Sequence, residues 1–209
     1  MISSKFDRSS KQISYLDKVD DREDVKQRWL NMMPSTEPVW IFGYGSLMWN
    51  PRFSFDAFEP AKVFGYHRRF CVYSHIYRGT SENPGLVLGL DRGGSCKGIA
   101  FRISASAAHK VLGAVWDREM IYGIYLAQDV YAKINDGRIL CRTFVVNPNH
   151  QQYAARMSDL QIAKIISGAH GKAGPNTAYL QNTLNHMQIV GFSDPSLWRI
   201  QHAVEQFLG

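Results

Sequence analysis

The sequence of 209 residues contains only three cysteines and no long apolar segment. Cys71, Cys96 and Cys141 form no CxxC pair, so they support neither a disulfide framework nor a zinc site. No segment approaches the roughly 18 consecutive apolar residues of a membrane-spanning helix. The first thirty residues mix charged and polar side chains and lack the apolar core of a secretory signal. We therefore expect a cytoplasmic protein that has no membrane partner.

Metal-binding patterns are also missing. The seven histidines include no HExxH motif and no other closely spaced ligand set, so we predict no metal site and no cofactor. A Ser–His–Asp or Cys–His hydrolase stays open, because the residues of such a site meet only in the folded chain. With 45% hydrophobic and 20% charged residues, the chain has the composition of one globular domain.

The net charge of +6 comes from one part of the chain. Residues 61–110 carry eight Lys and Arg against two acidic residues, which accounts for the whole excess. These cations are spread through strand-like sequence, whereas a nucleic-acid-binding arm is normally a contiguous basic run. We therefore predict no nucleic-acid partner. A basic cleft for a small anionic ligand and a solvated basic surface are the two remaining interpretations.

The chain divides into an N-terminal extension, residues 1–37, and one domain, residues 38–209. In the extension, a polar tail over residues 1–14 precedes a helix predicted over residues 15–33, which ends at the prolines that follow. Four more helices are expected in the domain. They begin after Ser104 or Ser106, at Ser158, near Pro175, and at Ser193 or Asp194.

Most of the sequence between residues 39 and 146 has the pattern of strands. Residues 85–92 and 96–103 are expected as two strands joined by a Gly93–Gly94 turn, and Asn135–Asp136–Gly137 predicts a hairpin. Short turns favour an antiparallel or mixed sheet that curls towards a barrel over a doubly wound parallel sheet. We therefore predict an α+β fold, a small mixed or antiparallel β-barrel with flanking helices.

The first candidate site is a strand that runs directly into a Gly-x-Gly-Ser turn, Ile41-Phe42-Gly43-Tyr44-Gly45-Ser46-Leu47. Glycines there let successive backbone N–H groups point at one place, which can hold an anion or an oxyanion. The segment lacks the lysine and the spacing of a P-loop, and its serine follows the second glycine, unlike GxSxG. The other interpretation is a tight turn capped by Ser46.

The second candidate is a glutamate on the apolar side of its predicted helix. At about 100° per residue, Glu119 shares one stripe with Leu112, Val115 and Trp116, whereas Asp117 is turned away. A carboxylate in that place is either desolvated or paired with a nearby arginine. Desolvation raises its pKa, which suits a general base and acid near neutral pH. Both interpretations stay open.

Two further segments supply candidate binding residues. Tyr66–Phe70 is a basic, aromatic strand; one of its faces is expected to line a cleft, and Arg69 is our candidate contact. The Gly-rich turn over residues 169–176 is usually just a connection between two helices. Asn176 and Tyr179 are nevertheless within reach of a ligand on its far side.

From residue 39 onwards the sequence resembles the ChaC-type γ-glutamylcyclotransferases, which degrade glutathione. The resemblance rests on seven segments in one order: VWIFGYGSLMWNP, GYHRRFCVYS, RGTSENPGLVLGLDRGGSCKGIAFRI, WDREM, TFVVN, AHGKAGPNTAYLQNT and DPSLWR. It leaves about the first 37 residues uncovered. So many segments in one order are far more specific than the Gly-Tyr-Gly-Ser-Leu turn alone.

The resemblance implies a small β-barrel with flanking helices, with Glu119 as the catalytic glutamate. It also implies that the turn after the first strand binds the γ-glutamyl part of the substrate. The candidate substrate-binding residues are then Ile41, Phe42, Gly43, Tyr44, Gly45, Ser46, Leu47, Arg69 and Tyr179. One departure is visible: this chain has Leu126 after Gly123-Ile124-Tyr125, where such proteins commonly read Gly-Gly-Tyr-Arg. The contribution of this loop to substrate choice is therefore open.

The implied reaction converts glutathione to 5-oxoproline and Cys-Gly. The glutamyl α-amine attacks its own γ-carbonyl, with Glu119 as base and then acid, and no water, metal or covalent intermediate is required. The alternative is a non-catalytic regulator that binds a γ-glutamyl ligand on the same scaffold, since members of this family were once described as cation-transport regulators. The sequence leaves open the oligomeric state and the strictness for glutathione.

Overall fold

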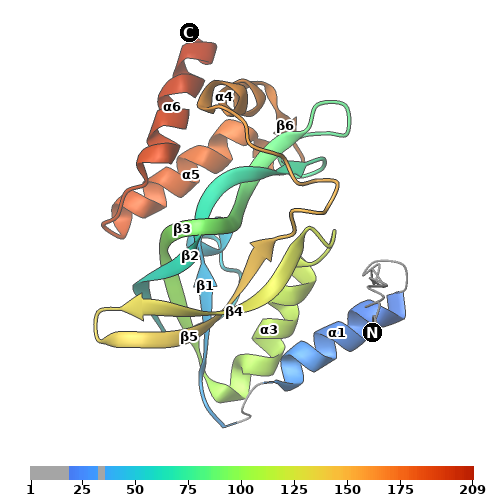
Figure 1. Ribbon diagram of the computed structural model, residues 1–209, viewed down its shortest axis with the longest axis vertical. Coiled ribbons are helices and arrows are strands. Elements are labelled where there is room, and N and C mark those ends of the chain that lie inside the picture. The colour runs from blue at the N-terminus through green and yellow to red at the C-terminus, as the bar shows by residue number, and fades with distance from the viewer. Residues whose placement is uncertain (1–18, 33–35) are drawn as a thin grey trace, which may run out of the picture.

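The fold is built on a five-stranded barrel (Figure 1). The computed structural model describes residues 19–32 and 36–209, so the predicted polar tail and the start of the helix predicted over residues 15–33 lie outside the described residues. The barrel is closed in the order β1-β3-β2-β4-β5. Its strands are β1 (Val39–Gly43), β2 (Ala57–Ser74), β3 (Gly85–Ile103), β4 (Tyr125–Ile134) and β5 (Gly137–Val146).

Strand β1 makes the barrel mixed. It pairs antiparallel with β3, where Ile41 lies opposite Phe101, and parallel with β5, where Ile41 lies opposite Arg142. The other pairs of neighbouring strands are antiparallel, including the hairpin of β4 and β5 that was expected at Asn135–Asp136–Gly137. The predicted α+β fold with a mixed barrel is therefore confirmed.

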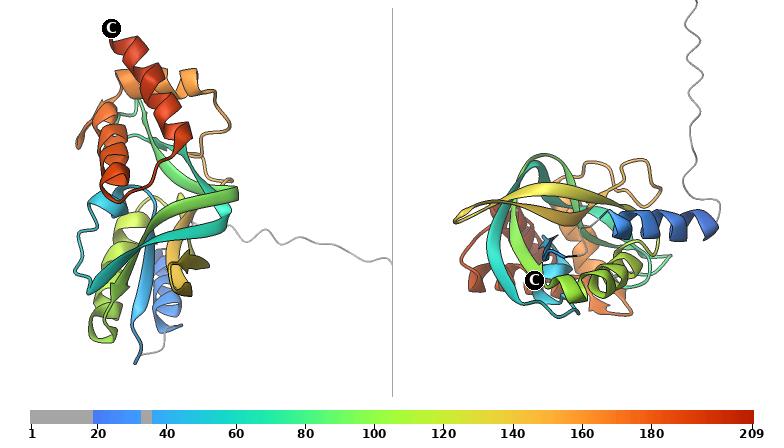
Figure 2. Two further views of the ribbon diagram at one scale, coloured as in Figure 1. Left: turned by 90° about the vertical axis from the view of Figure 1, so that its left-hand side faces the viewer. Right: turned by 90° about the horizontal axis from the view of Figure 1, so that it is seen from below.

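The prediction of two strands over residues 85–92 and 96–103 is wrong, because β3 is continuous through both. Gly93 and Gly94 have φ angles of 99° and 67°, and Gly65 on the facing strand has a φ of 83°. Glycine adopts such angles without steric cost, so these residues bend the ribbon of β2 and β3 and shift its register without ending the pairing. The bent ribbon connects the barrel to the C-terminal helices (Figure 2).

Helices lie at two ends of the molecule (Figure 1). At one end, α1 (Val19–Asn31) lies beside α3 (Ala105–Glu119). At the other end are α4 (Asp159–Gly168), α5 (Asn176–Ile189) and α6 (Pro195–Leu208), with the short strands β6 (His170–Gly171) and β7 (Gly174–Pro175) between α4 and α5. A single turn of helix, α2 (Ser46–Trp49), follows β1. Among the described residues, no helix is both long and apolar enough to cross a membrane.

Local sequence signals explain where these helices begin. Ser158 and Gln161 form a capping box at the start of α4, in which each side chain bonds the other residue's backbone N–H. The Asp194 side chain caps α6, and Pro195 occupies its first turn, where a missing N–H costs nothing. The helices expected near these residues are confirmed.

Helix α3 faces the core as its stripe predicts. Leu112, Val115 and Trp116 are buried. Asp117 points outwards, where its carboxylate lies 2.7 Å from the Nζ of Lys26 on α1. The rings of Trp116 and Trp29 are 5.0 Å apart, so α1 packs directly against the helix that carries Glu119.

Candidate active site

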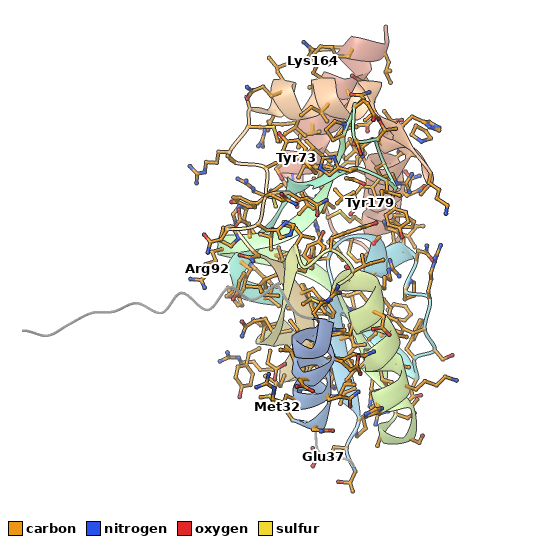
Figure 3. The ribbon with its side chains drawn as sticks, turned by 90° about the vertical axis from the view of Figure 1, so that its right-hand side faces the viewer. Met32, Glu37, Tyr73, Arg92, Lys164 and Tyr179 are labelled. Carbon is orange, nitrogen blue, oxygen red and sulfur yellow. The ribbon has the colours of Figure 1, made fainter. Side chains whose placement is uncertain are left out.

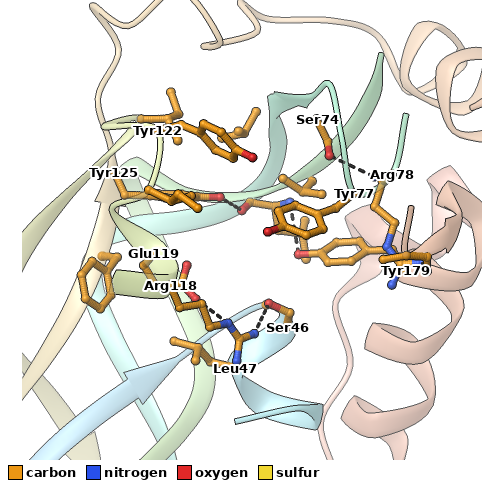
Figure 4. Close-up of a pocket in the computed structure, with 18 of the residues that line it drawn as sticks. Ser46, Leu47, Ser74, Tyr77, Arg78, Arg118, Glu119, Tyr122, Tyr125 and Tyr179 are labelled. Carbon is orange, nitrogen blue, oxygen red and sulfur yellow. Dashed lines mark hydrogen bonds and ion pairs between the residues drawn. The ribbon is translucent and has the colours of Figure 1, made fainter. Parts of the chain in front are cut away.

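A cleft of about 1000 Å³ opens where the barrel meets the C-terminal helices. The turn after β1, the end of β2 with the loop after it, and the end of α3 with the loop after it all contribute walls. Tyr179 of α5 closes one side, and its ring points into the space between the barrel and the helices (Figures 3 and 4).

The turn after β1 is held tightly on both sides, which explains its glycines. A Cβ on Gly43 would lie 3.0 Å from the Cβ of Leu47, and one on Gly45 would lie 3.0 Å from the hydroxyl of Tyr179. Gly45 precedes α2 and supplies no side-chain cap. Ser46 is the first residue of α2, and its hydroxyl accepts a hydrogen bond of 2.9 Å from Arg118. Ser46 therefore contacts the end of α3.

Glu119 is the last residue of α3, and its side chain is only 15% exposed. Burial raises the pKa of this carboxyl, and the neighbouring Arg118 partly offsets that rise. The Nε of Arg118 lies 3.2 Å from Oε1 of Glu119. Both interpretations of the sequence are thus realised together: the carboxylate is desolvated and also paired with an arginine.

Arg118 connects Glu119 to the loop that follows α2. Its Nη1 donates to the carbonyls of Asn50, at 2.7 Å, and Pro51, at 3.1 Å, while its Nη2 donates to Ser46. One guanidinium therefore holds the helix end, the turn and the loop in a fixed relation (Figure 4). The helical periodicity of the sequence predicted no role for Arg118, because this residue lies beside the apolar stripe and not within it.

Three tyrosines surround the carboxylate. The hydroxyl of Tyr44 donates to the Phe144 carbonyl at 2.8 Å, and that of Tyr125 to the Leu88 carbonyl at 3.0 Å. Burial raises the pKa of both hydroxyls well above the usual range, and it raises the pKa of Tyr179 to about 12. All three stay neutral at physiological pH, so Glu119 is the group in this part of the cleft that is suited to exchange protons.

Arg78, from the loop after β2, lies across the cleft from Glu119 (Figure 4). It is 8% exposed, and its Nη1 donates to the carbonyls of Ala173, at 2.6 Å, and Pro175, at 3.1 Å. Its guanidinium lies 5.6 Å from the ring centroid of Tyr179. Within the described part of the chain it forms no ion pair with a carboxylate, and burial lowers its pKa. A buried cation without an acidic partner suits an anionic ligand.

The structure brings part of the candidate set together. The cleft is lined by Tyr44, Gly45, Ser46, Leu47, Glu119 and Tyr179. Ile41, Phe42 and Gly43 are buried beneath it and do not line it. Asn176 is fully buried and bonds both the N–H and the carbonyl of Leu86, so it anchors α5 to β3.

The basic strand does not supply the cleft with its cations. Arg69 lies outside the lining, where it pairs with Asp91 at 3.2 Å and donates to the Ala154 carbonyl at 2.8 Å. Arg68 is buried, bonds the carbonyls of Tyr44 and Lys97, and pairs with Asp194 at 3.2 Å. Leu126 is 45% exposed and also outside the lining.

Comparison with family models identifies the family of this chain. The model of a family described as ChaC-like protein matches residues 39–207. The chain belongs to the ChaC-like family. That range contains every residue named above as lining the cleft. Among the described residues, no group of three or more His, Cys, Asp or Glu side chains is arranged to hold a metal ion.

Several ChaC-like relatives have curated names. The glutathione-specific gamma-glutamylcyclotransferase of Escherichia coli K12 is 36% identical, and the match covers 84% of this chain and 76% of that protein. The protein of the same name from Schizosaccharomyces pombe is also 36% identical, over 68% of this chain and 79% of its own. The human glutathione-specific gamma-glutamylcyclotransferase 1 is 31% identical, and the match covers 74% of this chain and 72% of that protein.

The ChaC-like fold is also found among solved structures. A crystal structure of a γ-glutamyl cyclotransferase specific to glutathione from yeast matches with a TM-score of 0.75 and 20% identity, over 82% of this chain and 97% of that chain. YkqA from Bacillus subtilis matches with a TM-score of 0.57 and 20% identity, and the match covers 86% of this chain and 58% of that chain. At such identities, the likeness concerns the fold alone.

Proposed function

We propose that this chain cleaves glutathione to 5-oxoproline and Cys-Gly. The observation that carries the proposal is the position of Glu119, a mostly buried carboxylate with a raised pKa inside the cleft. The names of the relatives supply the substrate class, and the chemistry of the cleft agrees with it.

In the proposed reaction, Glu119 moves a proton twice. The glutamyl α-amine is largely protonated at neutral pH, so the carboxylate first accepts a proton from it. The freed nitrogen attacks the γ-carbonyl carbon and closes a five-membered ring. As the bond from that carbon to the cysteinyl nitrogen breaks, Glu119 gives its proton to the leaving nitrogen. The attacking nitrogen carries two protons after the attack and loses one of them to solvent as it becomes the ring amide, and the released amine of Cys-Gly takes up one proton from solvent. No water molecule is consumed, and the enzyme returns to its starting state.

The cleft favours cyclisation by holding the glutamyl chain folded. Well-oriented intramolecular reactions reach effective molarities of about 10⁵ M or more, so positioning alone supplies a large part of the rate. Backbone N–H groups of the turn around Gly45 and Ser46 are suited to bind the glutamyl carboxylate or the developing oxyanion. Arg118 fixes this turn relative to Glu119.

Arg78 gives the substrate a direction in the cleft. With the glutamyl group at Glu119, the glycine carboxylate at the other end of glutathione is the anion that reaches across to the Arg78 guanidinium. Charge-assisted hydrogen bonds of this kind are stronger than neutral ones, and a buried guanidinium strengthens them further. Leu126 takes no part in this arrangement, because it lies outside the lining.

A cytoplasmic location is part of the proposal. It is supported by the three free cysteines, all of them buried, because unpaired cysteines are typical of reducing compartments.

The test is to incubate the purified protein with glutathione, and in parallel with γ-glutamyl-alanine, and to quantify 5-oxoproline. Glu119→Gln is expected to lose at least about 10²-fold in kcat while remaining folded, since this is the usual contribution of a general acid or base. Glu205→Gln, at an exposed glutamate on α6, is the matched control and should match the parent protein.

Each outcome of this assay has one meaning. Product formation from glutathione but not from γ-glutamyl-alanine supports a glutathione-specific enzyme. Turnover of γ-glutamyl-alanine alone keeps the reaction and changes the substrate. Folded protein that binds glutathione but releases no product supports the non-catalytic regulator instead.

A further inference from the structure

The outer face of the barrel carries four cations that the proposed reaction does not use. Lys62 of β2 lies opposite Lys97 of β3 and, on its other side, opposite Lys133 of β4; Lys133 lies opposite Arg138 of β5. Directly opposite residues of neighbouring strands point to the same face. These four residues, the cation row, cross four strands and extend over about 14 Å, at about 4.8 Å per strand.

Exposed apolar side chains lie beside the cation row. Phe64, Tyr131 and Leu140, here the apolar row, are 57%, 60% and 51% exposed, and each lies two residues from a cation on its own strand. Tyr131 lies opposite Leu140. The Nζ of Lys62 is 5.0 Å from the ring centroid of Phe64, and the guanidinium of Arg138 is 5.1 Å from that of Tyr131. The two rows therefore form one surface.

The fold itself gives no reason for the cation row. Like charges directly opposite each other destabilise a sheet. In the part of the chain that the structure describes, none of the four cations forms an ion pair. The sequence contains no Asp or Glu over residues 60–68, 92–103 or 137–146, and Asp129, the acidic residue of β4, pairs with Arg142 at 3.2 Å. An anionic partner supplies the missing opposite charge.

We propose that this face binds single-stranded nucleic acid, with phosphates along the cation row and bases stacked on Phe64 and Tyr131. Proteins that bind single strands combine a basic track with exposed aromatic rings in this way, often on a sheet surface. The sequence weighed against nucleic acid only because its cations are not contiguous. Strand register removes that objection, since it brings residues from four strands into one line.

A lipid surface fits the same face less well. The tip of the β4–β5 hairpin is Asn135–Asp136–Gly137, which is polar and carries an acidic residue. The cations come next, and the apolar row lies farther from the tip than they do. A hairpin that inserts into an anionic membrane needs the opposite order, with apolar residues leading.

The proposed surface is separate from the cleft, because none of its seven residues lines the cleft. Variants of the surface should therefore leave cyclotransferase turnover unchanged. This separation allows the binding to be tested without relying on the proposed reaction.

The first experiment measures fluorescence anisotropy of labelled U15 and dT15 oligonucleotides with the full chain at increasing salt concentration. Contact with two to four phosphates predicts a slope of log K against log salt of about −1.4 to −3, at roughly −0.7 for each phosphate. The double variant Lys133→Glu/Arg138→Glu should lose binding at least tenfold. The control is Lys164→Glu, a charge reversal on α4 near the helical end (Figure 3), which should bind as the parent does.

The second experiment tests the rings. Phe64→Ala and Tyr131→Ala should each weaken oligonucleotide binding by about tenfold, the usual effect of removing one stacked ring, and leave binding of inorganic polyphosphate unchanged. The proposal is overturned if the oligonucleotides fail to bind at low salt, or if Lys164→Glu weakens binding as much as the double variant does. It is also overturned if the ring variants have no effect, or if phosphatidylglycerol vesicles bind and the oligonucleotides do not.

Discussion

The cleft and the outer face of the barrel both present cations, which are largely buried in the cleft and exposed on the outer face. In the cleft, Arg78 and Arg118 are largely buried, and backbone carbonyls fix their guanidinium groups. On the outer face, the side chains of Lys97, Lys133 and Arg138 are exposed, and no carboxylate pairs with them among the described residues. A planar guanidinium fixed in place can recognise one anion in one geometry, whereas a row of exposed cations suits a partner that carries charge along its length. The two proposals therefore assign different kinds of recognition to the fixed and to the exposed cations.

The largest effect is expected at Arg118, whose guanidinium pairs with the Glu119 carboxylate. Arg118→Met should lower kcat by about 10²-fold, because a small displacement of catalytic groups costs this much. Loss of the cation should also move the acidic limb of the kcat–pH profile to higher pH, since Arg118 lowers the pKa of Glu119.

The conservative variant separates charge from geometry at this position. Arg118→Lys keeps the positive charge but not the forked donors, so its acidic limb should stay near that of the parent while kcat still falls. If Arg118→Met loses activity with an unmoved limb, its role is to hold the loop and not to set the pKa of Glu119.

A smaller effect is expected at Arg78. Arg78→Met should reduce kcat/KM for glutathione by about tenfold or more, the scale of a hydrogen bond to a charged group. Amidation of the glycine carboxylate of glutathione should lower kcat/KM of the parent protein by the same factor. For Arg78→Met, the amidated substrate should give nearly the same kcat/KM as glutathione itself. If amidation costs both proteins equally, Arg78 only supports the turn of residues 173–175.

The stability of the cleft should depend on pH through Glu119. Because burial raises its pKa in the folded state, the folded protein binds more protons than the unfolded chain between the two pKa values. The free energy of unfolding therefore falls as pH rises through this range. Glu119→Gln should have a higher Tm than the parent protein at pH 7, and this difference should vanish near pH 4. If the variant and the parent have the same Tm at both pH values, the carboxylate is not desolvated as described.

The smallest effect is expected on the outer face. Lys133→Gln removes one of several opposed cations, so Tm should stay the same or rise slightly, within the roughly 0.5 kcal/mol usual for exposed positions. Thermal unfolding at low and high salt checks this, because salt should reduce any gain. A clear fall in Tm would mean that the cation row contributes to the fold itself.

The features that follow from local sequence were predictable. The helical stripe that includes Trp116 placed Glu119 on the inner side of α3, and a glycine turn after an apolar strand pointed to residues 43–46. Asn135–Asp136–Gly137 gave the hairpin, because the turn geometry itself requires such residues. Each of these signals depends on neighbours within a few positions.

The features that depend on register or on long loops were not predictable. Arg78 reaches the cleft because a loop folds back towards residues 173–175, and no local pattern reports this contact. The cation row requires the pairing of Lys62 with both Lys97 and Lys133, and a shift of one residue would turn each to the other face. Gly93–Gly94 signals a turn in the sequence, but paired neighbours on both sides keep the strand continuous.

Cyclisation at Glu119 without attack by water is the central claim, and the most direct test is the reaction of glutathione in H₂¹⁸O, analysed by mass spectrometry. The account predicts unlabelled 5-oxoproline and Cys-Gly in equal amounts, with formation at least about 10²-fold slower for Glu119→Gln. Glutamate that carries ¹⁸O would show hydrolysis instead, and a near-parental rate for Glu119→Gln would remove that carboxylate from the mechanism.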